Sequence, residues 1–370
     1  MRIKNFVLFG FVLCGAVTAC GEPDRSAAVE HDSSANAFDA GSTPTTDSGL
    51  PDGSSTSSVL LIVMPSAPSL PRCTSPYAPV LESIPAAEQL PVFANATDGL
   101  SVGTATAAAT APTNWADVTS VDLPTLSSKL AVFSRLATSI CPGAVEFAHE
   151  YSVVTAFPPA ADVNGSTAIS KDDPRFAAWA TKVLSVDYGA GVTTIWQTPD
   201  RALGPATEDT TDIVSLGEGG TVSLGFDVKI ADGDGYDLAV FENGFADNYL
   251  ELAFVEVSSD GVNFVRFDSA SLVSANVGAY GTLDPTQFEG LAGKYRIGYG
   301  VPFDLAWLRA RPEVQSGLVR LDQITAVRVV DIIGDGRNRD SFGHVIYDPY
   351  PTVGSAGFDL DAIGVLNAAP

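Results

Sequence analysis

The chain has 370 residues, of which 20 are lysine or arginine and 44 are aspartate or glutamate, so its formal net charge is −24. This acidic excess argues against nucleic acid as a partner and against a basic patch that adheres to anionic lipid, because both need clustered positive charge. With only three histidines, the sequence also argues against a histidine-rich zinc site. These totals suit an exported surface protein or a protein that binds cations.

The first twenty residues have the order of a secretory signal. Arg2 and Lys4 precede an uncharged apolar run over residues 5–18, which is too short to cross a bilayer. The run closes on the letters V-T-A-C, which resemble the lipobox of bacterial lipoproteins. That resemblance implies that residues 1–19 are a signal peptide, and that Cys20 is acylated and holds the protein to a membrane, at the outer membrane or cell surface.

Residues 20–58 are dominated by serine, threonine, aspartate, glycine and alanine. Such a segment buries too little apolar surface to offset its chain entropy, so we expect a disordered tether between the lipid and a folded part. No later segment reaches 18 apolar residues, and no transmembrane helix is expected.

Residues 59–160 are predicted to form a mixed α/β segment whose fold the sequence does not name. Four apolar residues recur there at three- and four-residue spacing, which predicts one amphipathic helix ending before a Cys-Pro-Gly stop. They are Leu126, Leu130, Phe133 and Leu136.

Two cysteines remain once Cys14 leaves with the signal and Cys20 carries the lipid. In an exported chain Cys73 and Cys141 have one internal pairing available, and a disulfide between them is expected.

Residues 161–370 change character, with short β-rich runs that alternate with Gly/Asp turns. The letters SDG at residues 259–261 predict a hairpin, and the segment 171–183, with an aspartate before Pro174, predicts a helix. Many short strands without intervening helices indicate a mainly β domain, a β-sandwich or jelly roll. The predicted strands are 221–228, 236–243, 250–259, 262–267, 325–333 and 358–366.

Two resemblances narrow this fold. The runs FVEVSSDGVNFVRF, ITAVRVVDI and FDLDAIGVLN resemble the last strands of discoidin-type and other galactose-binding-like domains. A denser likeness over about residues 165–367 links the chain to an uncharacterised family of bacterial cell-surface proteins, through DDPRFAAWA, DGDGYDLAVFENGF and YDPYPTVGSAGFDLDAIGVLN. The resemblance implies an exported jelly-roll domain of galactose-binding-like type and carries no established activity.

The strongest local signal for a ligand is the run D-G-D-G-Y-D. It places Asp232, Asp234 and Asp237 in a tight turn, where carboxylate and carbonyl oxygens suit calcium. Asp359 and Asp361 on the closing strand are further predicted ligands, because galactose-binding-like domains commonly take a calcium ligand from that strand. The competing interpretation is a solvated turn whose aspartates cap their own backbone.

A catalytic alternative rests on paired carboxylates. Glu242, Glu251 and Glu256 lie on two successive predicted strands, and two carboxylates across a cleft are the machinery of glycoside hydrolysis. No G-x-S-x-G elbow is present for a serine hydrolase.

A sugar-binding platform is the alternative use of the aromatic residues. Trp307, Tyr299, Tyr347 and Tyr350 fall in loop-like segments with Arg296 nearby, and jelly rolls that bind sugars stack pyranose rings on such side chains. The competing interpretation is that these rings anchor the core.

Three functions follow from the sequence. The first is a non-catalytic, lipid-anchored surface protein that binds glycan or another extracellular ligand through a calcium-stabilised β-sandwich. The second is an extracellular polysaccharide hydrolase, and the third is a structural or adhesive envelope protein without a small ligand.

Overall fold

The computed structural model describes the strands between residues 83 and 154, and then residues 156–309 and 311–370. The chain divides into a unit of residues 1–56 and a unit of residues 57–370. The predicted signal, Cys20, the tether, Cys73 and Cys141 lie outside the described residues. None of the helices in the described part is both long and apolar enough to cross a membrane.

The early part of the second unit is built from strands. One four-stranded sheet has the order β1-β6-β5-β3, with β1 and β6 parallel and the other pairs antiparallel, and β2 pairs with β4. The helix predicted around Leu130 is wrong, because this stretch forms β5 between two partner strands. Val132 and Phe133 favour a strand, and pairing with β3 and β6 outweighs the helical spacing of the apolar residues. The bounds are β1 Ser83–Pro85, β2 Gln89–Pro91, β3 Ser101–Ala105, β4 Ser120–Asp122, β5 Lys129–Arg135 and β6 Glu146–Val154.

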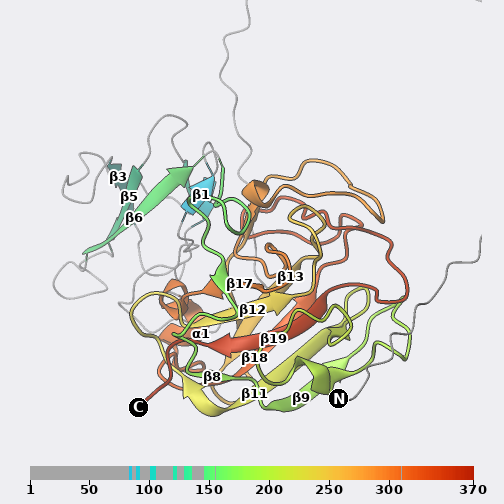
Figure 1. Ribbon diagram of the computed structural model, residues 1–370. Helices are drawn as coiled ribbons and strands as arrows, with labels where there is room; N and C mark the ends of the chain where they lie inside the picture. The colour runs from blue at the N-terminus through green and yellow to red at the C-terminus, as the bar shows by residue number, and fades with distance from the viewer. Residues whose placement is uncertain are drawn as a thin grey trace, which may run out of the picture. The chain divides into compact units, whose positions relative to one another are not determined.

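The C-terminal part is a mainly β domain of two antiparallel sheets (Figure 1). The first sheet has the order β10-β19-β12-β17-β7, with β8 also paired to β19, and the second has the order β14-β13-β18-β11-β9. The bounds of the first sheet are β7 Ile169–Ser170, β8 Ala178–Trp179, β10 Val214–Ser215, β12 Leu238–Glu242, β17 Tyr299–Phe303 and β19 Asp359–Val365. Those of the second are β9 Lys182–Asp187, β11 Thr221–Ile230, β13 Ala253–Ser258, β14 Val265–Arg266 and β18 Ile324–Asp331.

The chain changes sheet at almost every step. From β10 onward, the first sheet takes β10, β12, β17 and β19, and the second takes β11, β13, β14 and β18. A small β15–β16 pair and four short helical turns fill the connections. Their bounds are β15 Ala270–Ser271, β16 Phe288–Glu289, η1 Pro199–Ala202, η2 Pro285–Gln287, η3 Leu305–Leu308 and α1 Pro312–Gln315.

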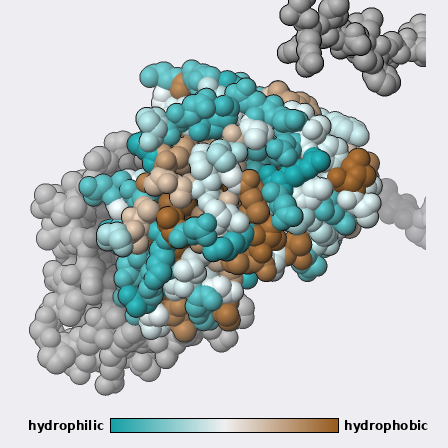
Figure 2. All heavy atoms as spheres, turned by 60° about the horizontal axis from the view of Figure 1, so that its bottom comes forward, coloured by the Kyte–Doolittle hydropathy of each residue, from teal (hydrophilic) through white to brown (hydrophobic). Residues whose placement is uncertain are grey.

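One hydrophobic core lies between the two sheets. It takes alternate residues from strands of both, such as Val240 of β12 and Val329 of β18, which are fully buried. The strands β12 and β13 are buried on both faces, because further side chains cover the outer faces of the sheets. Figure 2 shows that hydrophilic side chains alternate with smaller hydrophobic groups on one face of the surface.

The six strands predicted in this domain are confirmed, with ends that differ by a few residues. The hairpin is confirmed too: β13 and β14 pair antiparallel across a turn in which Gly261 has a φ of 74°. The carboxylate of Asp260 accepts hydrogen bonds from the backbone N–H of Val262 and of Asn263, at 2.8 Å each.

The helix predicted over residues 171–183 is wrong. The N–H of Ala177 donates to the carbonyl of Val365, and β8 extends the edge of β19 at this point. The rings of Phe176 and Trp179 pack together and against Phe241 on the outer face of the first sheet. Tertiary hydrogen bonds and ring packing therefore outweigh the local capping signal.

Candidate functional site

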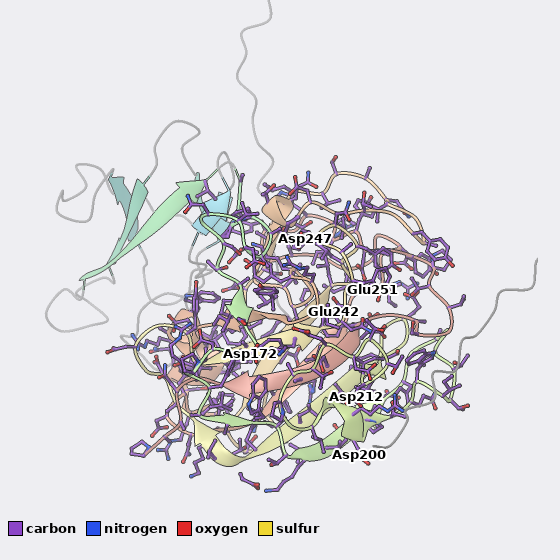
Figure 3. All side chains as sticks on the ribbon, viewed as in Figure 1. Asp172, Asp200, Asp212, Glu242, Asp247 and Glu251 are labelled. Carbon is purple, nitrogen blue, oxygen red and sulfur yellow. The ribbon has the colours of Figure 1, made fainter. Side chains whose placement is uncertain are left out.

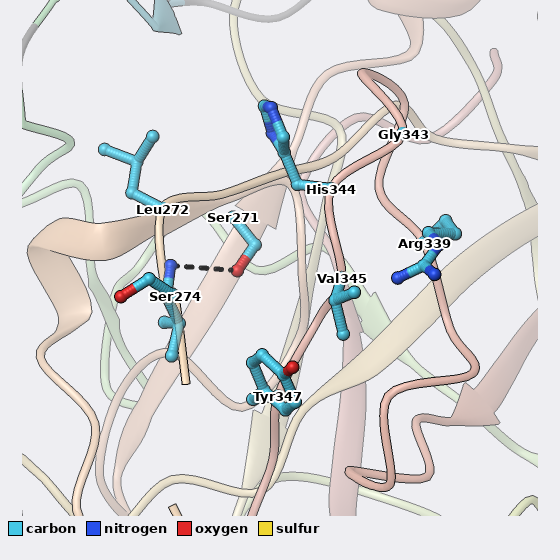
Figure 4. Close-up of a pocket in the computed structure, with 9 residues that line it drawn as sticks. Ser271, Leu272, Ser274, Arg339, Gly343, His344, Val345 and Tyr347 are labelled. Carbon is cyan, nitrogen blue, oxygen red and sulfur yellow. Dashed lines mark hydrogen bonds between the residues drawn. The ribbon is translucent and has the colours of Figure 1, made fainter. Parts of the chain in front are cut away.

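A surface groove of about 600 Å³ lies beside β15, where the 339–347 loop returns past it (Figure 4). Its wall carries hydroxyl, imidazole, guanidinium and phenol groups together. The lining residues are Ser271, Leu272, Val273, Ser274, Arg339, Gly343, His344, Val345 and Tyr347.

Asp340 fixes the shape of this wall from beneath. It is buried, and its two oxygens accept from the backbone N–H of Ser271, Phe342 and His344 at 2.8–2.9 Å. The Nδ1–H of His344 also donates to Asp340 Oδ2 at 3.2 Å. One carboxylate thus ties both sides of the groove, so the groove is preformed.

Arg339 is set apart from the other arginines. Within residues 156–309 and 311–370, each other arginine pairs with a carboxylate, at 2.5–3.9 Å. Arg339 is exposed and has no hydrogen bond or ion pair within the described chain. In a protein of net charge −24, an unpaired guanidinium at the edge of a groove is a ready partner for an anion.

A second feature is a group of five buried carboxyl groups at one end of the two sheets, named here the acidic cluster. Glu242 ends β12 and Asp359 begins β19, and these strands are neighbours; Asp331 ends β18, beside the start of β13. Figure 3 shows Glu242 and Glu251 at this end. The members are Glu242, Glu251, Asp331, Asp348 and Asp359.

Burial shifts the protonation of the whole cluster. Burial and the nearby carboxylate of Asp359 raise the pKa of Glu242 and of Glu251 well above the usual value for glutamate. Burial raises the pKa of Asp331 and of Asp359 to about 7 in each case. Burial and Asp331 also raise the pKa of Asp348. The five groups therefore sense one another's charge across both sheets.

The predicted calcium loop lies elsewhere. Asp232 and Asp237 come together there with Asp304, their carboxylate oxygens within 4.8 Å of one another. Arg309 donates to both oxygens of Asp232, at 2.6 and 2.8 Å. Asp234, on the same turn, is exposed.

Asp237 is held by hydrogen bonds from the protein itself. Its oxygens accept from the N–H of Gly233, the N–H of Leu305 and the side-chain amide of Asn367, at 2.7–2.9 Å. Asp237 therefore caps the backbone of its own turn, which is the interpretation that competes with a calcium ligand. On the closing strand, Asp361 accepts from the N–H of Thr207, while Asp359 belongs to the acidic cluster.

The five predicted sugar-binding residues divide among separate places. Trp307 is 8% exposed and packs edge-on to Tyr236 and Phe267 within the core. Arg296 stacks on the ring of Tyr299, and Asp162 accepts from both side chains.

The remaining two lie close in sequence but differ in setting. Tyr347 lines the groove, and Tyr350 is half-buried outside the groove's lining. The groove residues His344 and Ser271 were not predicted as ligands, and no motif in the sequence marks them.

The carboxylates of the hydrolase hypothesis are not presented to solvent as a pair. Glu242 is 2% exposed at the end of the first sheet. Glu256 lies on the second sheet, where Arg266 and Arg328 both donate to it.

Comparison with known proteins assigns no family. No family model matches the chain, and no curated protein matches it either. Among solved structures, a SusE-like protein is similar at 8% identity and a TM-score of 0.31, over 80% of this chain and 98% of that one. At this TM-score the likeness does not establish a common fold, and it assigns no function to the chain.

Proposed function

We propose that the protein is a lipid-anchored surface protein whose β-sandwich binds a glycan that carries carboxylate groups, without transforming it. The lipid anchor and the export signal are inferred from the first twenty residues, which end at Cys20. The ligand site of the proposal is the groove that Asp340 shapes.

The observation that carries the proposal is the unpaired guanidinium of Arg339 beside Tyr347 in that groove. Arginine recognises a carboxylate through two parallel hydrogen bonds, and an aromatic ring offers an apolar face for a sugar ring. The hydroxyls of Ser271 and Ser274 and the ring of His344 add groups that pair with sugar hydroxyls.

The proposal includes a jelly-roll fold. A jelly roll is an eight-stranded antiparallel hairpin wound into two sheets, so its first strand pairs with its last and the pairing continues inward. Counting from β10, the first strand pairs with the eighth (β10–β19) and the second with the seventh (β11–β18). The third pairs with the sixth (β12–β17) and the fourth with the fifth (β13–β14). These four pairings support the jelly roll, with β7 and β9 added at the edges.

Calcium is the second part of the proposal. The predicted ligands fall at two places, and at the Asp232 loop Arg309 already neutralises one carboxylate. Asp359 lies among four other buried acids that have no such partner, so the stronger support for a structural calcium comes from the acidic cluster.

Binding of polysaccharides to the full mature chain tests the ligand. We expect the protein to bind polygalacturonate and to ignore neutral dextran, with binding that weakens as salt is added. Arg339→Ala should weaken binding roughly ten- to hundredfold, because it removes a charge-assisted hydrogen-bond pair.

The matched control is Arg337→Ala. Arg337 is exposed and pairs with Asp335, and it does not line the groove, so its loss should leave binding unchanged. Equal binding by wild type and Arg339→Ala would refute the site, and a lack of binding to any acidic polysaccharide would favour the structural or adhesive alternative.

A further inference from the structure

Two oxygens of the acidic cluster have no partner. Glu242 Oε2 and Asp359 Oδ1 are buried and accept no hydrogen bond from the described part of the chain. Glu242 is 2% exposed and Asp359 is 5% exposed. Ser215, which stands opposite Asp359 in the β10–β19 register, and Asn243 are hydrogen-bonding neighbours of the Asp359 carboxylate. A buried oxygen left without a partner destabilises the fold, and a charged one does so more strongly.

Glu242, Asp359 and Ser215 come from neighbouring strands. β10, β19 and β12 are adjacent in the first sheet, where Ser215 pairs with Asp359 and Glu242 pairs with Leu360. The side chains of Glu242, Asp359 and Ser215 therefore lie together at one end of the first sheet.

No positive side chain compensates this end. Within the described residues, no lysine, arginine or histidine pairs with any member of the acidic cluster, although nearly every described arginine has a carboxylate partner elsewhere. Five buried carboxyl groups without a counter-charge must hold protons or bind a cation.

Glycine keeps space open beside one unpaired oxygen. A Cβ added to Gly244 would lie 2.7 Å from Glu242 Oε2 and 3.1 Å from the carbonyl oxygen of Tyr249. Any other residue at position 244 would fill the gap between a carboxylate and a carbonyl, two oxygen types that bind calcium.

We infer that the acidic cluster is a calcium site at the end of the sandwich, with Glu242 and Asp359 as ligands and Glu251 beside them. The inference deepens the calcium part of the proposed function, and it is independent of the groove. The cluster offers only oxygen ligands, whereas zinc and copper prefer nitrogen or sulfur ligands. Its several carboxylates suit calcium, because magnesium keeps most of its bound water and takes only one or two carboxylate ligands.

Binding requires a local rearrangement. The ligand oxygens are not gathered within 4.8 Å of one another, as those of Asp232, Asp237 and Asp304 are, so the glutamate side chains must rotate toward the ion. Asp331 and Asp348 remain in place, because backbone N–H groups hold them: Gly219 and Phe358 donate to Asp331, and Leu252 donates to Asp348. The ion would then join the end of β12 to the start of β19, within reach of the second sheet through Asp331.

Thermal unfolding of the full chain at pH 7.5 tests the site. After treatment with a chelator, calcium chloride should raise Tm by roughly 5 °C or more at a few millimolar, and magnesium chloride should raise it less. Equilibrium dialysis against radioactive calcium should give one bound ion per chain. An unchanged Tm together with no bound calcium overturns the inference.

Substitutions locate the ion. Glu242→Gln and Asp359→Asn should each abolish the calcium shift. Each should also raise Tm in chelator above that of the wild type, because a neutral amide avoids the cost of burying a carboxylate or of protonating it. This double signature separates a ligand from a merely structural residue.

Asp232→Asn is the matched control. It lies in the other carboxylate group and should keep the full calcium shift. A shift that is lost in Asp232→Asn and kept in Glu242→Gln places the ion at the loop and overturns the inference. If calcium binds here but polygalacturonate does not bind, the groove proposal alone has failed.

Discussion

Arg266 on β14 donates from Nε and Nη2 to a single oxygen of Glu256 on β13, at 2.9 and 2.7 Å. The other oxygen of Glu256 accepts from Arg328 on β18 at 3.1 Å. The three residues stand opposite one another in the register of adjacent strands, so the glutamate bridges two arginines across the second sheet.

The first prediction concerns Glu256 and the two arginines that it bridges. Glu256→Gln removes the charge that both arginines bind, and we expect the free energy of unfolding in urea to fall by about 1–2 kcal/mol. Asp322→Asn, in an exposed pair with Arg320, should leave it unchanged. Polysaccharide binding should persist in Glu256→Gln. A hydrolase that uses this glutamate would instead lose turnover with its stability intact.

The second prediction concerns Trp307, one of the aromatic residues predicted to form a sugar-binding platform. Its ring lies edge-on to Tyr236 and Phe267 in the core, so Trp307→Ala should lower the free energy of unfolding by about 3–5 kcal/mol. Trp307→Phe keeps an aromatic ring and should cost less. Calorimetry of polygalacturonate binding should show the same affinity for Trp307→Phe and the wild type; weaker binding by a fully stable variant would contradict the core position.

The third prediction concerns a buried ion pair. Lys294 donates to Glu289, and their side chains are 1% and 8% exposed. Replacing the acid alone, as in Glu289→Gln, should cost about 3–5 kcal/mol because it removes the carboxylate that pairs with a buried ammonium. Adding Lys294→Met to that variant should recover part of the loss. A double-mutant cycle measures this coupling, and strictly additive losses would show that the pair is not coupled.

The fourth prediction is a pH dependence. Burial raises the pKa of Asp237 from its ordinary 3.8 to about 6. The folded protein therefore holds this proton more tightly than the unfolded chain, and the stabilising effect present below about pH 4 is lost as pH rises through about 6. A pKa raised from 3.8 to about 6 corresponds to at most about 3 kcal/mol of stability.

Asp237→Asn has no proton to lose. Its amide sets N–H groups against the donors of Gly233 and Leu305, so the variant should be less stable at each pH. Its stability should nevertheless fall less than that of the wild type between pH 4 and pH 7 in urea unfolding. An identical pH slope in the two proteins would contradict the raised pKa.

The strands of the C-terminal domain were predictable because period-two patterns and Gly/Asp turns are local signals. The run at 221–228 and the hairpin at Asp260 are examples. The helix predicted over 171–183 shows the limit of such signals. An aspartate before Pro174 caps a helix in isolation, but the edge of β19 and the ring of Phe241 offer this segment better partners.

The sites were predictable only in part, for the same reason. Glu242, Glu251 and Asp359 each attracted notice as acidic residues on strands, but the sequence does not state that β19 lies beside β12. That adjacency joins residues more than a hundred positions apart. The groove residue Arg339 was less visible still, because what distinguishes it is the lack of a carboxylate partner in the described fold.

The position of β19 has a consequence for how this protein is made. The last strand of the chain lies inside its sheet, between β10 and β12, and so the first sheet cannot close until residues 359–365 are available. A chain shortened before residue 359 would leave two strand edges with unpaired N–H and C=O groups, the surfaces on which proteins aggregate. Because most of the pairings join distant stretches of sequence, folding of this domain is expected to be slow, and its first sheet is complete only once residues 359–365 have been synthesised. Until then the growing chain exposes the open edges of β10 and β12.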